Sequence, residues 1–467
     1  MGEVDAKRRV RGAFNPCLKA PLTRRASHAD LSHKGRGINE GNPMNNHSLA
    51  LSRNRFWILL MPWLVWGISS LFVTYQMLLQ TAPSVMLTDL QSAFSVNKFG
   101  VSLLSSCFFY TYLLLQIPSG MLVDRVHPRY CLTFCLLGIV ISTLLFAWAP
   151  TLAMAKTSRI LQGVFSAPSV VPALYLAAIW FPAKRFALVA GLTEMIGMSG
   201  AALGQVLLAP SVDQYGWRGT LVGCALLGLA LALLTYTLVR ENPDDAEKKK
   251  QQAKNKTSFL RDLLVVISYP QAWINGLFSG LLFSIAAAFG SLWCIPYLMQ
   301  VYSVSLDLAA GASGMLLFGV AFGAPVLGWI SDRIGLRRLP MLISTAMVFI
   351  LMMAVLYIPN IPITLMFILL FALGFFSSAY ALPFAVMRDI MPEHVRGTAM
   401  GYTNLMCILI GAPVLQPLIG WILNTELTMS PAHQALDYQY ALSVLPISLF
   451  IGLILAFFIK ETHCGKK

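Results

Sequence analysis

The chain has 467 residues, of which 57% are hydrophobic and only 12% are charged, and its net charge is +14. An average soluble domain has roughly 25% charged residues, so this composition excludes an ordinary soluble protein and indicates a membrane protein. The positive charge does not point to nucleic acid, because the basic residues gather in short segments between long apolar runs.

Residues 1–52 form a polar N-terminal segment with nine Lys or Arg residues and four acids. This segment lacks the apolar core of a cleaved signal peptide, and we expect a disordered basic tail. Met44 opens the stretch "MNNHSLALSRNRFW" and is an alternative translation start. The sequence leaves both starts open.

Twelve apolar runs follow, each about as long as the roughly 20 residues that a helix needs to cross a bilayer. They are too long and too uniformly apolar for membrane β-strands, so we expect an all-α integral membrane protein with its spans in contact with lipid. The runs cover residues 56–80, 99–123, 130–149, 152–181, 186–210, 217–239, 272–298, 309–331, 339–358, 362–386, 398–423 and 439–459.

The loops between these runs carry very unequal charge. From Arg53 onward, one set of loops and ends has 21 basic residues and the other set has three, namely Lys98, Lys156 and Arg218. Because short cytoplasmic loops are rich in Lys and Arg, we expect both termini to be cytoplasmic.

One long polar interruption divides the twelve runs into six and six. Residues 242–258, "NPDDAEKKKQQAKNKTS", show no apolar periodicity, and the two halves repeat features at a fixed offset, which is typical of transporters built from repeats. The predicted parts are a tail at 1–52, a first bundle at 53–240, a cytoplasmic linker at 241–271, a second bundle at 272–460 and a tail at 461–467.

The repeated feature is a charged turn after the second run of each half. "GMLVDRVHPR" contains Gly120, Asp124, Arg125 and Arg129, and "GWISDRIGLRR", 208 residues later, contains Gly328, Asp332, Arg333 and Arg337. A solvated loop would explain the arginines but not an aspartate that recurs in register, so we expect these eight residues to form a cytoplasmic gate in which the carboxylates bind arginines or helix N-termini.

These turns resemble the loop pattern G-x-x-x-D-R-x-G-R-R of the major facilitator superfamily, and the resemblance covers residues 53–463. His127, Pro128 and Leu336 depart from the pattern. The resemblance implies two pseudo-symmetric six-helix bundles that rock around a midplane site, and charged turns that close the cytoplasmic side when the cavity faces outward. It also implies that the first, fourth, seventh and tenth helices line the cavity. The candidate substrate-binding residues there are Tyr75, Gln76, Gln80, Arg159, Gln162, Asn275, Trp293 and Tyr380.

Arg159 and Glu194 are the ionisable residues deepest within the predicted spans. A charge at the centre of a span costs about 2.5–3.5 kcal/mol or more, so both need a function or a partner. Arg159, Gln162 and Gly163 match the R-x-x-Q-G pattern of the family, which implies a part in substrate or proton handling; the alternative is an arginine that binds backbone carbonyls of a broken helix. Glu194 is the candidate proton-coupling residue, and the alternative is a satisfied polar contact. The two residues differ by roughly 15 Å in predicted depth, which argues against a direct ion pair.

Together these features predict a monomeric secondary transporter of a bacterial inner membrane, without enzyme activity, cofactor or metal. A cavity with one cation, amides and aromatics favours an amino acid, short peptide or organic anion, moved by proton symport. The alternatives are a multidrug or metabolite exporter, an uncoupled facilitator, and a membrane sensor that transports nothing. The fifth helix lacks the Gly-Pro motif of drug antiporters, which weakens the exporter alternative.

Overall fold

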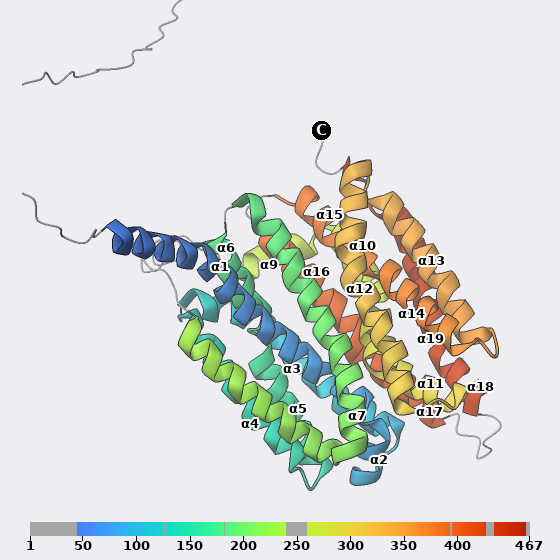
Figure 1. The fold of residues 1–467 in the computed structure, drawn as a ribbon. Helices are drawn as coiled ribbons and strands as arrows, with labels where there is room; N and C mark the ends of the chain where they lie inside the picture. The colour runs from blue at the N-terminus through green and yellow to red at the C-terminus, as the bar shows by residue number, and fades with distance from the viewer. Residues whose placement is uncertain are drawn as a thin grey trace, which may run out of the picture. The chain divides into compact units, whose positions relative to one another are not determined.

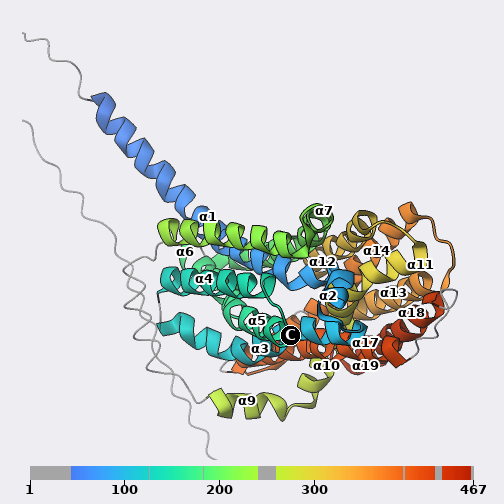
Figure 2. The same cartoon turned by 90° about the horizontal axis from the view of Figure 1, so that it is seen from below.

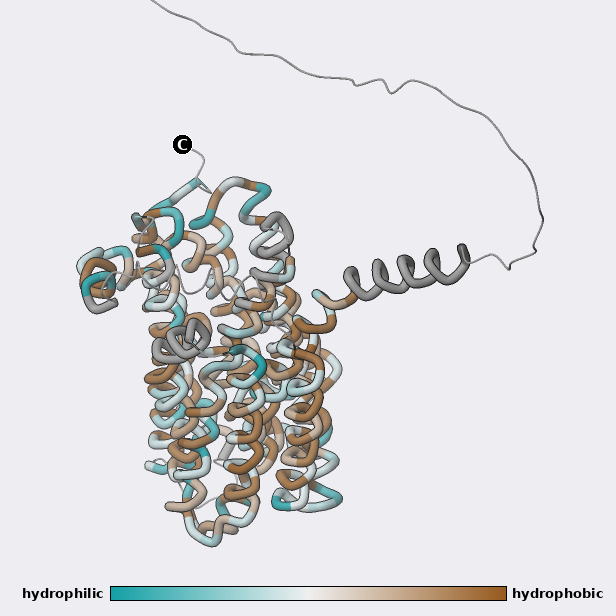
Figure 3. The backbone as a smooth tube through the Cα atoms, turned by 90° about the vertical axis from the view of Figure 1, so that its left-hand side faces the viewer, coloured by the Kyte–Doolittle hydropathy of each residue, from teal (hydrophilic) through white to brown (hydrophobic). Residues whose placement is uncertain are grey.

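The computed structural model describes residues 44–125, 127–181, 183–239, 259–392, 395–425 and 434–463. The chain divides into two units, residues 1–55 and 56–467, and the second contains all of the features below. Its described residues form helices and no strand (Figure 1). Hydrophobic residues predominate along these helices, and hydrophilic residues are more frequent toward the end of the bundle marked C (Figure 3).

The first half contains seven α-helices and one 3₁₀ turn. Pro128 stands at the first position of α4, and the Thr151 hydroxyl caps α5 by accepting a hydrogen bond from the Met154 N–H at 3.3 Å; both are common helix starts. The elements are α1 Met44–Thr81, η1 Ala82–Ser84, α2 Leu87–Phe94, α3 Lys98–Arg125, α4 Pro128–Ala147, α5 Leu152–Ser166, α6 Val170–Trp180 and α7 Ala183–Leu238.

The second half has more interrupted helices. Two π-helical segments, η3 and η6, and one 3₁₀ turn, η4, break its spans. The elements are α9 Phe259–Ile267, α10 Pro270–Ser284, η3 Ile285–Trp293, α11 Cys294–Tyr302, α12 Leu306–Ile334, α13 Arg338–Tyr357, α14 Ile363–Ser377, η4 Ser378–Ala381, α15 Leu382–Ile390, α16 Arg396–Leu409, η6 Ile410–Leu415, α17 Gln416–Thr425, α18 Gln434–Leu442 and α19 Val444–Phe458.

The twelve predicted spans correspond to these helices, although only ten of the described helices are long and apolar enough to cross a membrane. The predicted span 152–181 is divided between α5 and α6, each of which is too short alone. The predicted spans 186–210 and 217–239 both lie in α7, which is bent at Gly216, where φ is 68° and ψ is 165°. The difference in number therefore comes from one broken helix and one merged pair.

Two predicted boundaries differ from the structure. Residues 44–52, predicted as disordered tail, form the start of α1, while residues 1–43 lie outside the described part. Within the predicted linker, residues 241–258 are not described, but Phe259–Ile267 forms the amphipathic helix α9, whose Val266 packs against Met387 and Met391.

The two halves contact each other mainly through α7 with α12 and through α3 with α17 (Figures 1 and 2). Small residues allow the close approach, since a Cβ added to Gly314 of α12 would lie 2.9 Å from the Val206 side chain of α7. Small residues are the usual means of close helix packing in membranes. We call the two ends of the bundle the Asp332 end, predicted to be cytoplasmic, and the Gly216 end, predicted to be outside.

Candidate functional site

A cavity of about 40 Å³ lies between the two halves, with room for a few water molecules. Both halves contribute to its wall, so any relative movement of the halves changes it. The lining residues are Met77, Gln80, Phe109, Tyr112, Met198 and Ala201 of the first half and Phe283, Ala286, Ser291, Leu317 and Ile408 of the second.

One face of α7 runs along this cavity. Met198 and Ala201 line the cavity, and Glu194 and Gln205 lie on the same face because positions i, i+4, i+7 and i+11 follow one side of a helix. We call these four residues the α7 stripe. Both of its polar ends contact the other half of the protein.

At one end of the stripe, Glu194 accepts a hydrogen bond from the hydroxyl of Tyr380 in η4 at 3.2 Å. The Tyr380 ring packs against the Phe283 ring with 4.6 Å between centroids, and Phe283 lines the cavity. Glu194 lies inside a span, whereas the other described acids of the helices lie in first or last turns or beside the Gly216 bend. The contact with Tyr380 links this intramembrane carboxylate to the opposite half.

At the other end, the Gln205 amide donates hydrogen bonds to the Gly290 carbonyl at 2.6 Å and to the Ser84 hydroxyl at 3.2 Å. Gly290 lies in the π-helical segment η3 and accepts a second bond from Ser313. The Gln205 side chain is buried, and its bond to Gly290 joins the two halves on the side of the stripe nearer Gly216. Gln205 was not predicted from the sequence, although its spacing from Glu194 was a usable signal.

Arg159 is 1% exposed and lies beside the cavity rather than in its wall. Its guanidinium donates to the backbone carbonyls of Leu79 at 3.1 Å and Gln80 at 3.4 Å and to the Gln162 side chain at 2.9 Å. It also lies 5.0 Å from the centroid of the Phe108 ring. No carboxylate of the described residues lies within ion-pair distance of Arg159, and its Nε has no hydrogen-bond partner.

Of the eight predicted substrate-binding residues, only Gln80 lines the cavity in this conformation. Five others are buried in hydrogen bonds with their neighbours, and their role in substrate binding stays a prediction. Tyr75 donates to the Cys224 carbonyl, Gln76 to Gln80, Gln162 to Thr143, Asn275 to the Gln271 carbonyl and Trp293 to the Gln416 carbonyl.

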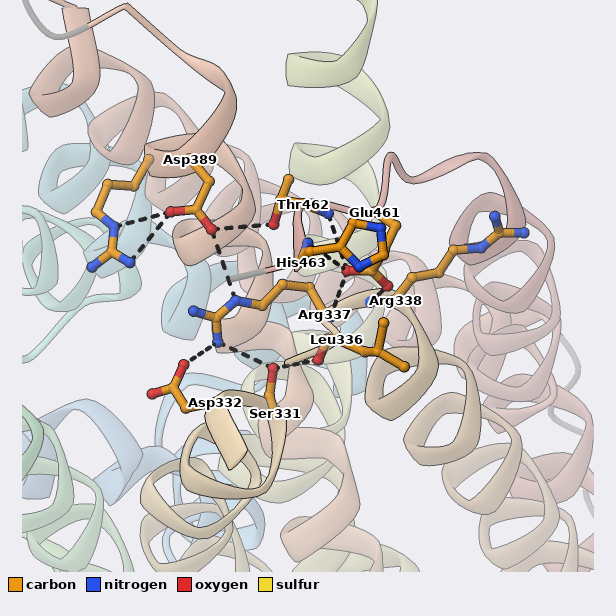
Figure 4. A network of polar contacts seen from close by, with 10 residues as sticks. Ser331, Asp332, Leu336, Arg337, Arg338, Asp389, Glu461, Thr462 and His463 are labelled. Carbon is orange, nitrogen blue, oxygen red and sulfur yellow. Dashed lines mark hydrogen bonds and ion pairs between the residues drawn. The ribbon is translucent and has the colours of Figure 1, made fainter. Parts of the chain in front are cut away.

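The second charged turn forms a network at the Asp332 end (Figure 4). Arg337 has a 5% exposed side chain and binds Asp332 at 2.7 Å and the Ser331 hydroxyl at 3.1 Å, and Asp389 lies 3.9 Å away. Gly328, Asp332 and Arg337 also line a cavity of about 210 Å³. Arg333 is exposed beside the Trp329 ring, so it lies outside this network.

Glu461 anchors the same network to the end of the chain. Its carboxylate accepts hydrogen bonds from the backbone N–H groups of Arg337 at 2.7 Å and Arg338 at 2.9 Å, where α13 begins. Partial burial by itself raises the pKa of Glu461, but four backbone N–H groups outweigh this effect and hold the pKa below its ordinary value. Neither Glu461 nor Asp389 was predicted, because nothing in the sequence brings residue 461 to residue 337.

The first charged turn is described only in part. The side chains of Gly120, Asp124 and Arg125 lie outside the described residues. Arg129 is described, and its guanidinium lies 4.2 Å from the centroid of the Tyr236 ring. The predicted gate therefore stays a prediction, with geometry available only for its second turn.

Two helical bundles around a shared cavity are the architecture of many secondary transporters. The sequence matches the Major Facilitator Superfamily over residues 68–415 and 294–463, and the chain belongs to this family of membrane transporters. The fold and family expected from the sequence are therefore confirmed, and family members transport solutes rather than act as enzymes.

Four proteins similar to this chain have names that indicate different roles. The membrane sensor protein UhpC of Escherichia coli is 23% identical over 79% of this chain and 88% of its own length, and UhpC of Salmonella typhimurium is 23% identical over 61% and 66%. The probable galactarate/D-glucarate transporter GudP of Escherichia coli is 24% identical over 85% and 93%. A solved bacterial homologue of the human lysosomal transporter Spinster has the same fold, with a TM-score of 0.70 and 17% identity over 86% of this chain and 97% of its own.

Proposed function

We propose that the protein is a proton-coupled symporter of a small organic anion in a bacterial inner membrane, with both termini in the cytoplasm. Arg159 is the observation that carries the anion. A buried cation without a carboxylate partner among the described residues attracts a negative charge, because a charge left uncompensated in a low-dielectric interior is costly. The relation to GudP, named as a sugar-acid transporter, supports the same substrate charge.

Glu194 is the proposed proton site. It lies inside a span, one helical turn from Met198 in the cavity wall, and its partner Tyr380 packs on Phe283 in the same wall. A carboxyl group placed between the halves exchanges its proton when the halves separate, because its contact with Tyr380 must then break. Besides Arg159 and Gln80, six candidate substrate residues remain, and none of the six lines the cavity here. In this proposal they either hold the residues that bind the substrate in place or bind the substrate in another conformation.

The anion proposal is tested by counterflow in proteoliposomes, which detects a substrate whatever the direction or coupling of transport. Vesicles loaded with an unlabelled organic anion are diluted into the labelled anion, and the labelled anion that enters is measured. Arg159→Gln should lower counterflow at least tenfold and Arg159→Lys less. Arg218→Gln is the matched control, since Arg218 also donates to backbone carbonyls but at Ala147 and Ala149.

Undiminished counterflow of the anion by folded Arg159→Gln would return Arg159 to a structural role. The relation to UhpC makes a sensor the second candidate. A sensor would bind its ligand without counterflow of any solute, so equilibrium binding measured on the same protein separates the two functions.

A further inference from the structure

The wall of the central cavity is mostly hydrocarbon. Its large side chains come from both halves and are Met77, Phe109, Met198, Phe283, Leu317 and Ile408. Apolar side chains with a few polar groups are typical of small-molecule sites, in which the apolar wall binds the body of the ligand and the polar groups orient it.

The polar groups in this wall have partners of their own. The Ser291 hydroxyl donates to the Ala286 carbonyl at 2.8 Å, and the Gln80 Oε1 atom accepts from Gln76 at 2.9 Å. Tyr112 has an interaction partner as well. Among the described residues the wall has only three polar side chains, Gln80, Tyr112 and Ser291, so a molecule with many hydroxyl groups would bury most of them without hydrogen bonds, which is unfavourable.

The positive charge is confined to one side of the cavity. Arg159 binds the main chain of Gln80, whose side chain lines the wall, whereas Phe283, Leu317 and Ile408 come from the other half. A ligand with its carboxylate at Gln80 would lay the rest of its surface against aromatic and aliphatic side chains. Met77 and Met198 are flexible enough to make room for it as the cavity widens.

We infer that, within the proposed function, the substrate is a monocarboxylate with an aromatic or branched aliphatic body, and that a polyhydroxylated sugar acid is excluded. The inference rests on the anion-transport proposal and narrows its substrate class. In this inference the wall residues select the apolar body of the substrate. Met198 gives the most direct test, because it lies in the wall and Glu194 is the only charged residue within one helical turn of it.

Counterflow with two labelled probes, benzoate and D-glucarate, tests the inference. We expect benzoate to show counterflow that excess 4-methyl-2-oxopentanoate suppresses, and we expect glucarate to show at least tenfold less. Met198→Gln, which places an amide in the wall at similar volume, should lower benzoate counterflow about tenfold relative to glucarate counterflow. Met198→Leu keeps the wall apolar and should leave the ratio of the two probes within about threefold.

The two levels of the proposal fail in different ways. Glucarate counterflow equal to or above that of benzoate in the wild type would overturn the inference and leave organic-anion transport standing. An unchanged probe ratio in folded Met198→Gln would also overturn it. Counterflow of neither anion, together with counterflow of a neutral or cationic solute from the same vesicles, would overturn the proposed function itself.

Discussion

Glu194 is a carboxylate inside a span, and its hydrogen bond with Tyr380 joins it to the opposite half of the protein. At the scale of single residues, the sequence already indicated its importance, because an acid in an apolar run is rare and expensive. Its partner could not be predicted, since Tyr380 is 186 residues away and only the packing of the two halves brings them together.

Glu194→Gln should abolish gradient-driven accumulation while counterflow continues, because an amide fills the same space but carries no exchangeable proton at neutral pH. Uptake with and without an inward proton gradient, compared with counterflow on the same vesicles, measures the separation. Accumulation that persists in Glu194→Gln would show that the coupling proton binds elsewhere. Asp213→Asn, at the exposed Gly216 end, is the control and should change neither measurement.

Glu461→Gln should lower the stability of the folded protein by about 1 kcal/mol, the usual size of a lost helix cap, or roughly one or two degrees in melting temperature. The ionised carboxylate is the better acceptor for the N–H groups of Arg337 and Arg338. Since folding lowers the pKa of Glu461, the extra stability is present above about pH 4.3, the ordinary pKa of Glu, and is lost as the pH falls through the folded value.

Melting curves of the two proteins at pH 7 and near pH 3.5 measure this difference. The gap between wild type and Glu461→Gln should shrink at the lower pH. A gap that is constant with pH would mean that Glu461 acts through its shape and not through its charge.

At the scale of helices, close packing depends on a few glycines that the sequence does not distinguish from the rest. A Cβ added to Gly374 of α14 would lie 1.9 Å from the Leu316 carbonyl oxygen of α12. Gly374→Ala should therefore force the two helices apart, at a cost of about 1–3 kcal/mol. The melting temperature of the purified protein measures the effect.

Gly223→Ala in α7 is the matched control, since no atom lies within 4 Å of its added Cβ. There alanine should be neutral or stabilising, by up to about 1 kcal/mol. Equal melting temperatures for the two variants would contradict the packing described for α12 and α14.

Gln205 joins the two halves toward the Gly216 end through one short hydrogen bond to Gly290, and we expect this bond to hold that end closed. Gln205→Leu should raise the population open at this end by roughly fivefold, because a buried hydrogen bond contributes about 1 kcal/mol and 1.4 kcal/mol is a tenfold change. Spin labels at Ser92 and Tyr440, both exposed, should show longer distances in pulsed electron paramagnetic resonance.

Gln214→Leu provides the comparison, because Gln214 lies on the same helix with its side chain exposed. It should leave the distance distribution as it is in the wild type. An unchanged distribution in Gln205→Leu would mean that other contacts between the halves, such as Tyr110 with the Pro413 carbonyl, hold this end closed.

At the scale of the whole molecule, the sequence predicted the spans, the division into halves and the family, because each of these depends on local hydrophobicity or on short motifs. The cavity wall was not predictable, since Met198, Phe283 and Ile408 look like ordinary apolar residues until the halves meet. The sequence predicted polar and aromatic residues as substrate-binding instead, and two of these, Tyr75 and Trp293, donate hydrogen bonds to backbone carbonyls.

Asp332→Asn should lower the fraction of molecules closed at the Asp332 end, because the predicted gate depends on a carboxylate that binds an arginine or a helix N-terminus and asparagine carries no negative charge. In the present structure Asp332 binds Arg337 of its own half. Labels at Tyr130 and Ile334, both exposed, report this distance. Asp307→Asn, at the opposite end of α12, should have no effect, and equal distributions in the two variants would remove Asp332 from the gate.

The α7 stripe places the proposed proton site Glu194, part of the cavity wall and the Gln205 contact toward the Gly216 end on a single helix. Glu194 and Gln205 are separated by eleven residues, or about 16 Å along the axis. A tilt of α7 that draws Gln205 away from Gly290 also moves Glu194 relative to Tyr380. Opening at the Gly216 end and protonation of Glu194 are then energetically coupled. By thermodynamic reciprocity, the factor by which protonation of Glu194 shifts this opening equals the factor by which opening shifts the proton affinity of Glu194. A variant that loosens the Gln205 contact should therefore move the apparent proton affinity of Glu194 toward that of the open state.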